Sequence, residues 1–495
     1  MALSRVLDAV RSAGVDVEEV AGAEHIADIA VGGVQQDSRT TGPGDLFVAW
    51  AGDAHDSHAF LKDVQRAGAV AALVERPVEG VELPQAVVGN ARLAAAVSAD
   101  LLVGSPWTAM RTAGITGTNG KTTTALILRS LLSASGPSAA IGTMGLTLPD
   151  GTIDPASEGL TTPGATQLST WLSELWKRGT ESVALEASSH ALDQYRLDGM
   201  RFDVMVFTNL TKDHLDYHGG WEGYLGAKAR LLDLAKDEGV AVVNADVDAW
   251  DALEPTGPVV TYGLERSADL IAKDVELGPQ ASRFRMAFRG DEAEARLPFP
   301  GGFNVQNALA ATGAALAMGE ELGELANALE RAPQVPGRME RVDLATFDVP
   351  FDVLIDFAHT PDALDRILDT LRPLVEGRLI VVFGAGGDRD RTKRPEMGRA
   401  VSRYADLGVV TSDNPRTEDP DDIADQVSAG VSGIRSEQIV DRRAAIEWAL
   451  AEAKDGDVVV LAGKGHETYQ VIGTEKRPFD ERVIVQDFLG RGRAS

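Results

Sequence analysis

Short runs of apolar residues recur along the chain, and many of them end directly in a polar or glycine-rich motif. Continuous apolar runs separated by helical stretches are typical of parallel strands that helices cover on both faces. Ligands of such sheets bind beyond the carboxyl ends of the strands. The motifs that stand there are residues 186–190, 208–216, 356–361, 384–391, 413–416 and 462–467. The pattern therefore predicts an α/β protein whose functional residues follow strand ends.

Breaks in this pattern divide the 495 residues into three predicted domains. Gly104-Ser105-Pro106 and the stretch 334–338 contain the glycine and proline residues that interrupt regular structure. The stretch 265–300 alternates apolar and polar residues and predicts an antiparallel excursion. We predict a small N-terminal α/β domain over 1–107, a central ATPase-like parallel sheet over 108–336 and a Rossmann-like C-terminal domain over 337–495.

Residues 112–124, Thr-Ala-Gly-Ile-Thr-Gly-Thr-Asn-Gly-Lys-Thr-Thr-Thr, join an apolar strand to a helical pattern. Glycines let backbone N–H groups close around phosphate oxygens, and the helix N-terminus favours negative charge. Lys121 can reach terminal phosphates, and Thr122 can place a hydroxyl on Mg²⁺. The spacing departs from the common P-loop, because Ile115 occupies the first glycine position and Gly114 comes one residue early. An ordinary glycine turn is the alternative, but a helix that opens on Gly-Lys-Thr-Thr favours a nucleoside triphosphate site.

Charge and composition narrow the possible partners. The chain has 47 Lys and Arg against 75 Asp and Glu, a formal net charge of −28. So acidic a surface repels nucleic acid and anionic membranes, and an anionic ligand must bind at a local basic cluster. Cysteine is absent, which excludes disulfides, thiolate catalysis and cysteine-ligated zinc and fits a cytoplasmic protein. We find no signal-peptide pattern and no apolar run near the ~20 residues of a membrane span, so we expect no membrane insertion.

Two strand-end motifs of the predicted central domain have the residue types of metal ligands. Glu186 follows a buried strand, where a carboxylate suits a Mg²⁺ ligand or a group that orients water. The alternative is a helix-capping cluster with Ser188 and Ser189. The carboxylates around His214 favour a second metal or phosphate site over a packing histidine. Lys228 lies on an amphipathic helix, and composition alone predicts a solvated lysine.

Arginines gather in the predicted C-terminal domain. A glycine-rich turn is followed by four basic residues: Arg389, Arg391, Lys393 and Arg394. Guanidinium groups there can hold an anion by bidentate contacts. The alternative is a solvated loop in which Asp388 and Asp390 are the partners. Asp413-Asn414-Pro415-Arg416 has the composition of a turn, and Arg416 is suited to clamp a carboxylate.

Together these motifs resemble the Mur ligase superfamily over nearly the whole chain. Gly-Thr-Asn-Gly-Lys-Thr-Thr is that superfamily's P-loop, which accounts for the glycine spacing. Residues 37–39 and 44–49 resemble its uridine-nucleotide domain, and residues 413–416 are similar to the motif of members that add meso-diaminopimelate. Members that add lysine tend to lack the arginine of this motif. A guanidinium would favour the second carboxylate of diaminopimelate and repel a lysine ammonium.

The resemblance implies further site residues. It assigns catalysis to Lys121, Glu186, His214, Lys228 and His359. It assigns ATP binding to Gly117, Thr118, Asn119, Gly120, Lys121, Thr122, Thr123, Asn304, Asn307, Arg341 and Asp356. The implied Mg²⁺ ligands are Thr122, Glu186, His214 and Lys228. Lys228 would carry a carbamate derived from CO₂, which converts a cation into an oxygen-donor anion.

Two substrates are implied in the same way. UDP-N-acetylmuramoyl-dipeptide would contact Gln36, Ser38, Asp53, Ala54, His55, Thr161, Thr162, Ser188, Gln194 and Arg196. meso-Diaminopimelate would contact Arg389, Asp413, Asn414, Pro415, Arg416, Gly463 and Glu467. Within that set, the resemblance implies that Glu467 takes the distal ammonium.

The implied reaction is an ATP-dependent, ADP-forming amide ligation in peptidoglycan precursor synthesis. A carboxylate does not react with an amine at pH 7, because oxide is a poor leaving group. The γ-carboxylate of D-Glu therefore attacks the γ-phosphorus, ADP leaves, and the diaminopimelate amine attacks the acyl phosphate. Lys121 and Mg²⁺ offset the charge of the transferring group. We expect domain closure to bring the amino acid to the acyl phosphate in a cytoplasmic, monomeric enzyme.

Alternatives stay open at this point. The same ligase could add L-lysine. A folylpolyglutamate synthetase shares the P-loop and the ligation chemistry but lacks the first domain's Asp-Ser-Arg and the Asp-Asn-Pro-Arg motif. A nucleotide-regulated ATPase without ligation needs no amino-acid pocket. Gly384-Ala-Gly-Gly387 is only a weak indication of a dinucleotide-dependent oxidoreductase, because its spacing is not Gly-x-Gly-x-x-Gly.

Overall fold

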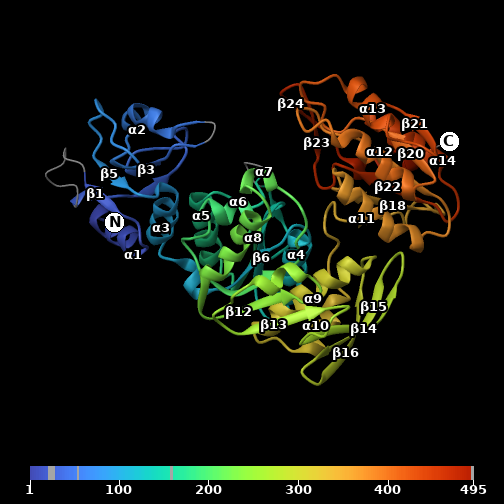
Figure 1. Ribbon diagram of the computed structural model, residues 1–495, viewed down its shortest axis with the longest axis horizontal. Helices are drawn as coiled ribbons and strands as arrows, with labels where there is room; N and C mark the ends of the chain where they lie inside the picture. The colour runs from blue at the N-terminus through green and yellow to red at the C-terminus, as the bar shows by residue number, and fades with distance from the viewer. Residues whose placement is uncertain (20–27, 53–54, 156–159, 492–495) are drawn as a thin grey trace. The chain divides into compact units, whose positions relative to one another are not determined.

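The computed structural model describes residues 1–19, 28–52, 55–155 and 160–491. It is the predicted α/β structure, and almost all of its strands belong to three sheets (Figure 1). Residues 1–273, 286–293 and 306–328 form one compact unit, and residues 274–285, 294–305 and 329–495 form another. Every helix of the described residues is too short or too polar to span a bilayer. The domain boundaries at residues 107 and 336 stay predictions.

The first sheet lies within the predicted N-terminal domain. Its five strands are, in spatial order, β1 (Val17–Glu19), β5 (Gln85–Val88), β4 (Ala71–Val74), β3 (Asp45–Ala49) and β2 (Gly33–Gln35). Alternate residues of a strand point to opposite faces. Leu46 of β3 therefore shares a core with α1 (Leu3–Ser12) and α3 (Ala91–Val103), and Phe47 shares another with α2 (Leu61–Ala67).

The second sheet has eleven strands and contains the glycine loop. Its central strands are, in order, β13 (Val259–Gly263), β12 (Ala235–Asn244), β11 (Phe202–Phe207), β6 (Arg111–Thr116), β10 (Ser182–Glu186) and β7 (Ser138–Gly142). These strands pair in parallel, with Glu186 opposite Ile115 and Phe207 opposite Thr116. The carboxyl ends of β10, β6 and β11 are therefore level, and the residues that follow them meet at one edge.

Further strands complete this sheet on both sides. Beyond β7 come β8 (Gly145–Thr147) and β9 (Ile153–Asp154), and beyond β13 come β14 (Leu270–Leu277), β15 (Ser282–Phe288) and β16 (Asp291–Leu297). In β15, Phe284 and Met286 are buried and Arg283 is exposed, so this stretch has the predicted period of two. The helices are α4 (Lys121–Leu132), α5 (Ala165–Lys177), α6 (Ser189–Asp193), α7 (Leu215–His218), α8 (Trp221–Ala229), α9 (Gly302–Ala317) and α10 (Leu322–Leu329).

The third sheet lies within the predicted C-terminal domain. Its strands are, in order, β17 (Glu340–Arg341), β18 (Asp352–Asp356), β22 (Val458–Ala462), β19 (Leu379–Phe383), β20 (Leu407–Val410) and β21 (Arg435–Gln438). All pair in parallel except β17. One core includes α11 (Pro361–Leu371), α12 (Lys393–Tyr404) and α13 (Pro420–Ser428), and another includes α14 (Arg442–Glu452) and α15 (Glu481–Arg491). A hairpin of β23 (Tyr469–Ile472) and β24 (Glu475–Pro478) follows β22.

Candidate active site

The glycine loop between β6 and α4 has the backbone shape of a phosphate-binding loop. Gly117 and Gly120 have φ angles of 146° and 86°, which side chains disfavour. A Cβ on Gly117 would lie 1.9 Å from Thr208 Oγ1, and one on Gly120 would lie 2.3 Å from Asn307 Oδ1. Both positions therefore require glycine, and Asn307 lies against the loop.

The loop following β11 fixes the glycine loop in place. Thr118 N donates to Asn209 O at 2.8 Å, and Asn119 N donates to Asn209 Oδ1 at 2.8 Å. Thr208 Oγ1 donates to Asn119 O at 2.7 Å. These contacts order the loop before a ligand arrives, which lowers the entropy cost of phosphate binding.

Two lysines share one carbonyl of this loop. Lys121 Nζ donates to Gly117 O and Thr118 O, both at 2.9 Å, and Lys228 Nζ donates to Gly117 O at 2.8 Å. Lys228 is 1% exposed, so the prediction of a solvated lysine is wrong. Helix α8 turns it inward, where its Nζ lies 4.6 Å from the centre of the Tyr224 ring. Burial, with the nearby charge of Lys121, lowers the pKa of Lys228 well below its usual value.

Glu186 ends β10 beside the start of α4. Its Oε2 accepts from Thr122 Oγ1 at 2.9 Å and from Thr143 Oγ1 at 3.1 Å, and its Oε1 accepts from Thr143 N at 2.8 Å. Glu186 caps no helix in these contacts, whereas Ser188 does cap α6 through Ala191 N at 3.2 Å. A carboxylate and a threonine hydroxyl fit Mg²⁺, which usually takes one or two protein ligands together with phosphate oxygens and water. The described residues contain no group of three or more His, Cys, Asp and Glu side chains that could hold a metal ion.

The residues predicted to contact the muramyl substrate adjoin Glu186. Thr162 Oγ1 donates to Glu186 O at 2.6 Å and accepts from Ser188 N at 3.0 Å. Arg196 donates to Thr162 O at 2.9 Å and to Gln194 Oε1 at 2.6 Å. Through Thr143, Thr161 joins the same network, since the two hydroxyl oxygens are 3.3 Å apart. Five predicted residues therefore belong to one hydrogen-bond network, which meets the backbone carbonyl of Glu186 at Thr162 and its carboxylate through Thr143.

The N-terminal residues predicted for this substrate are more dispersed. A Cβ on Gly164, which precedes α5, would lie 3.5 Å from Gln36 Oε1, so Gln36 approaches the start of α5. Ser38 lies half-buried in the turn after β2. His55 is exposed, and its carbonyl accepts from Gly52 N at 3.0 Å. Asp53 and Ala54 lie outside the described residues.

Histidines and a tyrosine stack close to this network. The ring centre of His190 lies 4.7 Å from that of His214, 4.1 Å from that of Tyr217 and 5.4 Å from that of His218. Burial and the neighbouring His214 lower the pKa of His190 to about 4, so His190 is neutral at pH 7. His214 is exposed, with Nε2 3.5 Å from Asp213 Oδ2.

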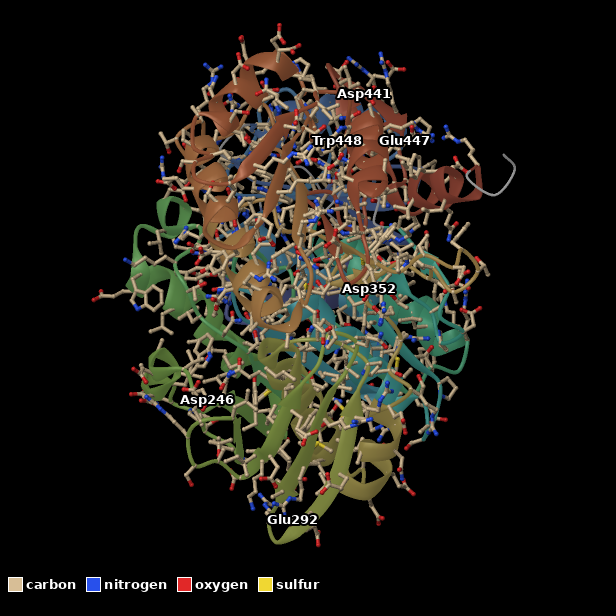
Figure 2. All side chains as sticks on the ribbon, turned by 90° about the vertical axis from the view of Figure 1, so that its right-hand side faces the viewer. Asp246, Glu292, Asp352, Asp441, Glu447 and Trp448 are labelled. Carbon is tan, nitrogen blue, oxygen red and sulfur yellow. The ribbon has the colours of Figure 1, made fainter. Side chains whose placement is uncertain are left out.

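The second unit contains four of the residues predicted for nucleotide binding or catalysis. Arg341 forms an ion pair with Asp352, at the start of β18. Figure 2 labels Asp352 among the side chains of the structure. Asp356 accepts from Met339 N and Ala358 N, both at 2.7 Å, and burial raises its pKa. His359 is exposed, with Nδ1 2.8 Å from Phe357 O. Asn304 is 3% exposed and donates to Pro300 O at 2.9 Å.

The loop after β20 holds Arg416 in an unusual conformation. Arg416 has a φ of 52°, in the left-handed region. The β23–β24 hairpin holds its backbone there, because Arg416 N donates to Val471 O at 3.1 Å and Gly473 N donates to Arg416 O at 2.7 Å. The guanidinium donates to Gly387 O at 2.7 Å. A Cβ on Gly386 would lie 2.9 Å from Arg416 Nη1 and 3.9 Å from Arg389 Cγ, so the two predicted arginines flank one glycine.

The remaining arginines of the basic cluster have a structural role. Arg394 is 1% exposed and donates to both oxygens of Glu418, at 2.8 and 3.2 Å. Arg391 lies 2.9 Å from the same carboxylate. These contacts, the hydrogen bonds of Arg394 foremost, lower the pKa of Glu418 to about 2. The partner of Arg391 and Arg394 is thus Glu418, not the predicted Asp388 and Asp390, and the anion site stays a prediction.

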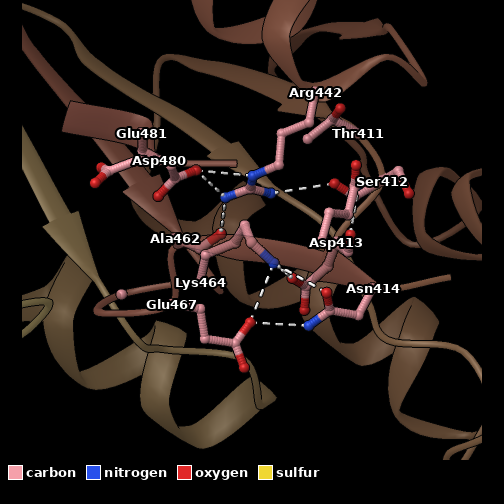
Figure 3. Close-up of polar contacts among 12 residues, drawn as sticks. Thr411, Ser412, Asp413, Asn414, Arg442, Ala462, Lys464, Glu467, Asp480 and Glu481 are labelled. Carbon is pink, nitrogen blue, oxygen red and sulfur yellow. Dashed lines mark hydrogen bonds and ion pairs between the residues drawn. The ribbon is translucent and has the colours of Figure 1, made fainter. Parts of the chain in front are cut away.

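Glu467, Asp413 and Asn414 meet around a lysine that the sequence did not single out (Figure 3). Asn414 Nδ2 donates to Glu467 Oε2 at 2.9 Å. Lys464 Nζ donates to Asn414 Oδ1 at 3.0 Å and to Glu467 Oε2 at 3.1 Å, and lies 3.5 Å from Asp413 Oδ1. Gly463 has a φ of 120° and lies beside Asp413. Pro415 is buried, with its carbonyl so close to Gly387 that a Cβ there would lie 1.9 Å from the oxygen.

Comparison with known proteins identifies the family. The Mur ligase middle domain matches residues 115–315, and the Mur ligase glutamate ligase domain matches residues 337–465. The UDP-N-acetylmuramoyl-L-alanyl-D-glutamate–2,6-diaminopimelate ligase of Gloeobacter violaceus is 42% identical over 480 residues, 95% of this chain and 96% of its own length. The chain belongs to the Mur ligase family.

Further relatives of this Mur ligase have the same name. The 2,6-diaminopimelate ligase of Geobacillus thermodenitrificans is 41% identical over 92% of this chain and 94% of its own length. A solved structure of a UDP-N-acetylmuramoyl-L-alanyl-D-glutamate–2,6-diaminopimelate ligase superposes with a TM-score of 0.69 at 35% identity, covering 94% of this chain and 96% of the other. The similarity is therefore close to full length in both sequence and fold.

Sequence reasoning missed several side chains at the site of this Mur ligase. They are Thr143 on Glu186, Thr208 and Asn209 on the glycine loop, Tyr224 over Lys228, and Lys464 among the C-terminal carboxylates. Thr208 and Asn209 belong to the strand-end motif 208–216 but were given no role there, and Thr143 follows β7, so the same strand-end rule could have found it. Tyr224 had no such signal. Lys464 lies in the strand-end motif 462–467, but only the folded chain shows that its side chain is buried.

Proposed function

We propose that this Mur ligase adds meso-diaminopimelate to UDP-N-acetylmuramoyl-L-alanyl-D-glutamate, with cleavage of ATP to ADP, in peptidoglycan precursor synthesis. The relatives described above have this activity in their names. The observation that carries the amino-acid assignment is the hydrogen-bonded unit of Arg416 and Glu467. Asn414 and the β23–β24 hairpin link the Glu467 side chain to the Arg416 backbone, because Asn414 hydrogen-bonds Glu467 Oε2 and Val471 N, and Val471 O accepts from Arg416 N.

This pair of charges matches the substrate. Diaminopimelate ends in one further ammonium and one further carboxylate, which Glu467 and Arg416 would bind respectively. Lysine has an ammonium but no carboxylate at that end, so it would leave the Arg416 guanidinium without an anionic partner and beside a like charge. We therefore propose diaminopimelate, not lysine, as the amino acid.

The phosphate chemistry would take place at the glycine loop. Backbone N–H groups of the loop and Lys121 bind the phosphates, while Thr162, Ser188 and Arg196 orient the acceptor carboxylate beside Glu186. That carboxylate attacks the γ-phosphorus, the bond to ADP breaks, and an acyl phosphate results. The neutral diaminopimelate amine then attacks the acyl carbon, and phosphate leaves as the amide forms and a proton is lost. Mg²⁺, held by Thr122 and Glu186, would offset phosphate charge when bound.

Lys228 is suited to carbamylation. The reaction joins CO₂ to a neutral amine and releases a proton, so it needs a lysine that is not an ammonium. The lowered pKa of Lys228 favours that neutral form, relative to an ordinary lysine. The carbamate nitrogen keeps one N–H, which can still donate to Gly117 O. We also propose that the enzyme acts in the cytoplasm as a monomer, where ATP and the nucleotide substrate meet.

Phosphate release tests the proposed reaction directly. With ATP, Mg²⁺ and UDP-N-acetylmuramoyl-L-alanyl-D-glutamate, we expect phosphate to appear with meso-diaminopimelate and at least about a hundredfold more slowly with L-lysine. Without the nucleotide substrate or without the amino acid, release should stop. Equal rates with lysine would contradict the amino-acid assignment, and release that needs neither substrate would indicate an ATPase without ligation.

Arg416→Ala is expected to lower kcat/KM for diaminopimelate by about 10- to 100-fold, the effect of losing charge-assisted hydrogen bonds. The KM for ATP should change little, and both constants are measured by initial-rate kinetics. Arg391→Ala is the matched control, because Arg391 is an exposed arginine of the neighbouring loop that pairs with Glu418. If Arg416→Ala leaves diaminopimelate kinetics unchanged, or weakens ATP equally, Arg416 does not recognise the amino acid.

A further inference from the structure

Lys464 is a fully buried lysine whose side chain is 0% exposed. It follows β22, and its Nζ contacts Asp413 Oδ1, Asn414 Oδ1 and Glu467 Oε2, as Figure 3 shows. An ammonium is costly to bury unless it is paired and hydrogen-bonded, and Lys464 meets this condition with side chains alone. All three partners belong to the amino-acid subsite proposed above.

The contacts of Lys464 determine which oxygen of Glu467 is available. Glu467 Oε2 accepts from both Asn414 Nδ2 and Lys464 Nζ. Among the described residues, Glu467 Oε1 has no hydrogen-bond partner, and in Figure 3 it points away from this cluster. The side chain of Glu467 is 19% exposed, so the carboxylate is held at one oxygen and accessible at the other.

The net charge of the cluster of Asp413, Asn414, Lys464 and Glu467 is suited to binding one more cation. Asp413 and Glu467 contribute two negative charges, and Lys464 contributes one positive charge, which leaves one negative charge in a mostly buried place. A single ammonium would neutralise it. Without Lys464, the negative charges of Asp413 and Glu467 would both be uncompensated. Their mutual repulsion would make it unfavourable for both carboxylates to be ionised at the same time.

A second buried ion pair shows that the backbone of these loops is held by other groups. Arg442 donates to Glu481 Oε1 at 2.8 Å, to Ala462 O at 2.8 Å and to Ser412 O at 3.4 Å (Figure 3). It therefore ties the ends of β20 and β22 together through their carbonyl groups. Lys464 joins the same two loops, but it contacts side chains of the proposed subsite and no backbone group among the described residues.

We propose that Lys464 is a positioning residue for amino-acid recognition: it holds Glu467 and Asn414 in place and adjusts the cluster to accept one substrate ammonium. This inference rests on the proposed function, since it names the residue that makes Glu467 specific for the distal ammonium. Lys464 does not touch the substrate itself. It acts through Glu467, whose second oxygen makes the contact.

The test compares two substrates that differ only in the distal ammonium. meso-Diaminopimelate has the distal ammonium, whereas 2-aminopimelate lacks it and is otherwise the same molecule. Wild-type enzyme should discriminate against 2-aminopimelate in kcat/KM. Lys464→Met should raise the KM for diaminopimelate about 10- to 100-fold, leave the KM for ATP within about twofold, and remove most of the discrimination. In the double variant with Glu467→Gln, Lys464→Met should add little to the loss of kcat/KM for diaminopimelate, because both changes act through one carboxylate.

Arg442→Met is the matched control, because Arg442 is equally buried and joins the same strands. It should lower the melting temperature but keep the wild-type ratio between the two substrates. The proposal is overturned if Lys464→Met keeps that ratio, or if Arg442→Met changes it equally. If Lys464→Met does not fold, Lys464→Gln replaces it, and failure of both to fold makes Lys464 a stability residue only. Wild-type enzyme that does not use diaminopimelate at all contradicts the proposed function instead.

Discussion

Lys121→Met is expected to lower kcat about a thousandfold, with a smaller change in KM for diaminopimelate. Lys121 Nζ contacts Gly117 O and Thr118 O of the glycine loop, so the cation lies where the phosphates of ATP are expected to bind. Charge develops on the transferring phosphoryl group during the reaction, and a fixed cation stabilises that charge more than the ground state. Removing such a group commonly costs a factor of this size. Single-turnover measurement of phosphate release would separate the chemical step from binding.

Lys236→Met is the control for this substitution. Lys236 lies in the same sheet but near the amino ends of its strands, where its Nζ contacts Asp203 Oδ2 at 2.7 Å and Met110 O at 3.1 Å. The Lys236→Met substitution should reduce thermal stability and leave kcat near the wild-type value. A wild-type rate in Lys121→Met, or an equal loss in Lys236→Met, would contradict a direct role of Lys121 in phosphoryl transfer.

The α/β fold class was predictable because its signal is local. Each parallel strand is a short apolar run, and both of its faces must be buried, so the pattern needs no knowledge of distant residues. The glycine loop was predictable for a related reason, since Gly117 and Gly120 have backbone angles that other residues disfavour. The placement of Glu186 and Asn209 beside this loop also follows from level strand ends, which the parallel register provides.

Burial of charged residues was not predictable from the same pattern. Lys228 and Arg394 lie on helices with ordinary surface patterns, yet both are 1% exposed. Which side of a helix faces inward depends on the elements that pack against it, and these come from distant parts of the chain. Lys228 meets Gly117 across 111 positions, and Arg394 meets Glu418 across 24. Composition contains no information on such pairs.

The burial of Lys464 was also not predictable, although this residue lies within a motif that was recognised in the sequence. Gly463 and Glu467 were assigned through resemblance, but Lys464 between them was not, because a lysine in a loop is usually solvated. Its burial follows from Asp413 and Asn414, which reach it from the neighbouring loop. The contacts of Asp356 likewise follow only from the fold, where its side chain accepts two backbone N–H groups, while its predicted role in nucleotide binding stays a prediction.

Lys228→Ala is expected to reduce kcat about a thousandfold, and small carboxylates such as formate or acetate should restore part of the rate. Carbamylated Lys228 would place a negatively charged group with oxygen donors next to the glycine loop, close to Lys121, since both lysines contact Gly117 O. Alanine removes that anion and leaves a gap beside Tyr224 and Gly117 that a small carboxylate can enter. The comparable loss in Lys121→Met should not respond to carboxylate, because that variant lacks a cation.

The carbamate itself can be observed separately from activity. Wild-type enzyme in ¹³C-bicarbonate should show a carbamate carbon signal in NMR spectra, and Lys228→Ala should lack it. The reaction needs the neutral amine, and burial with the charge of Lys121 lowers the pKa of Lys228, so this lysine should form the carbamate more readily than an ordinary lysine. Full activity of Lys228→Ala would show that no anion is required at this position. A third outcome is that Lys228→Ala is inactive, carboxylates do not restore its rate, and the wild-type enzyme shows no carbamate signal. Lys228 would then act as an amine that donates to Gly117 O.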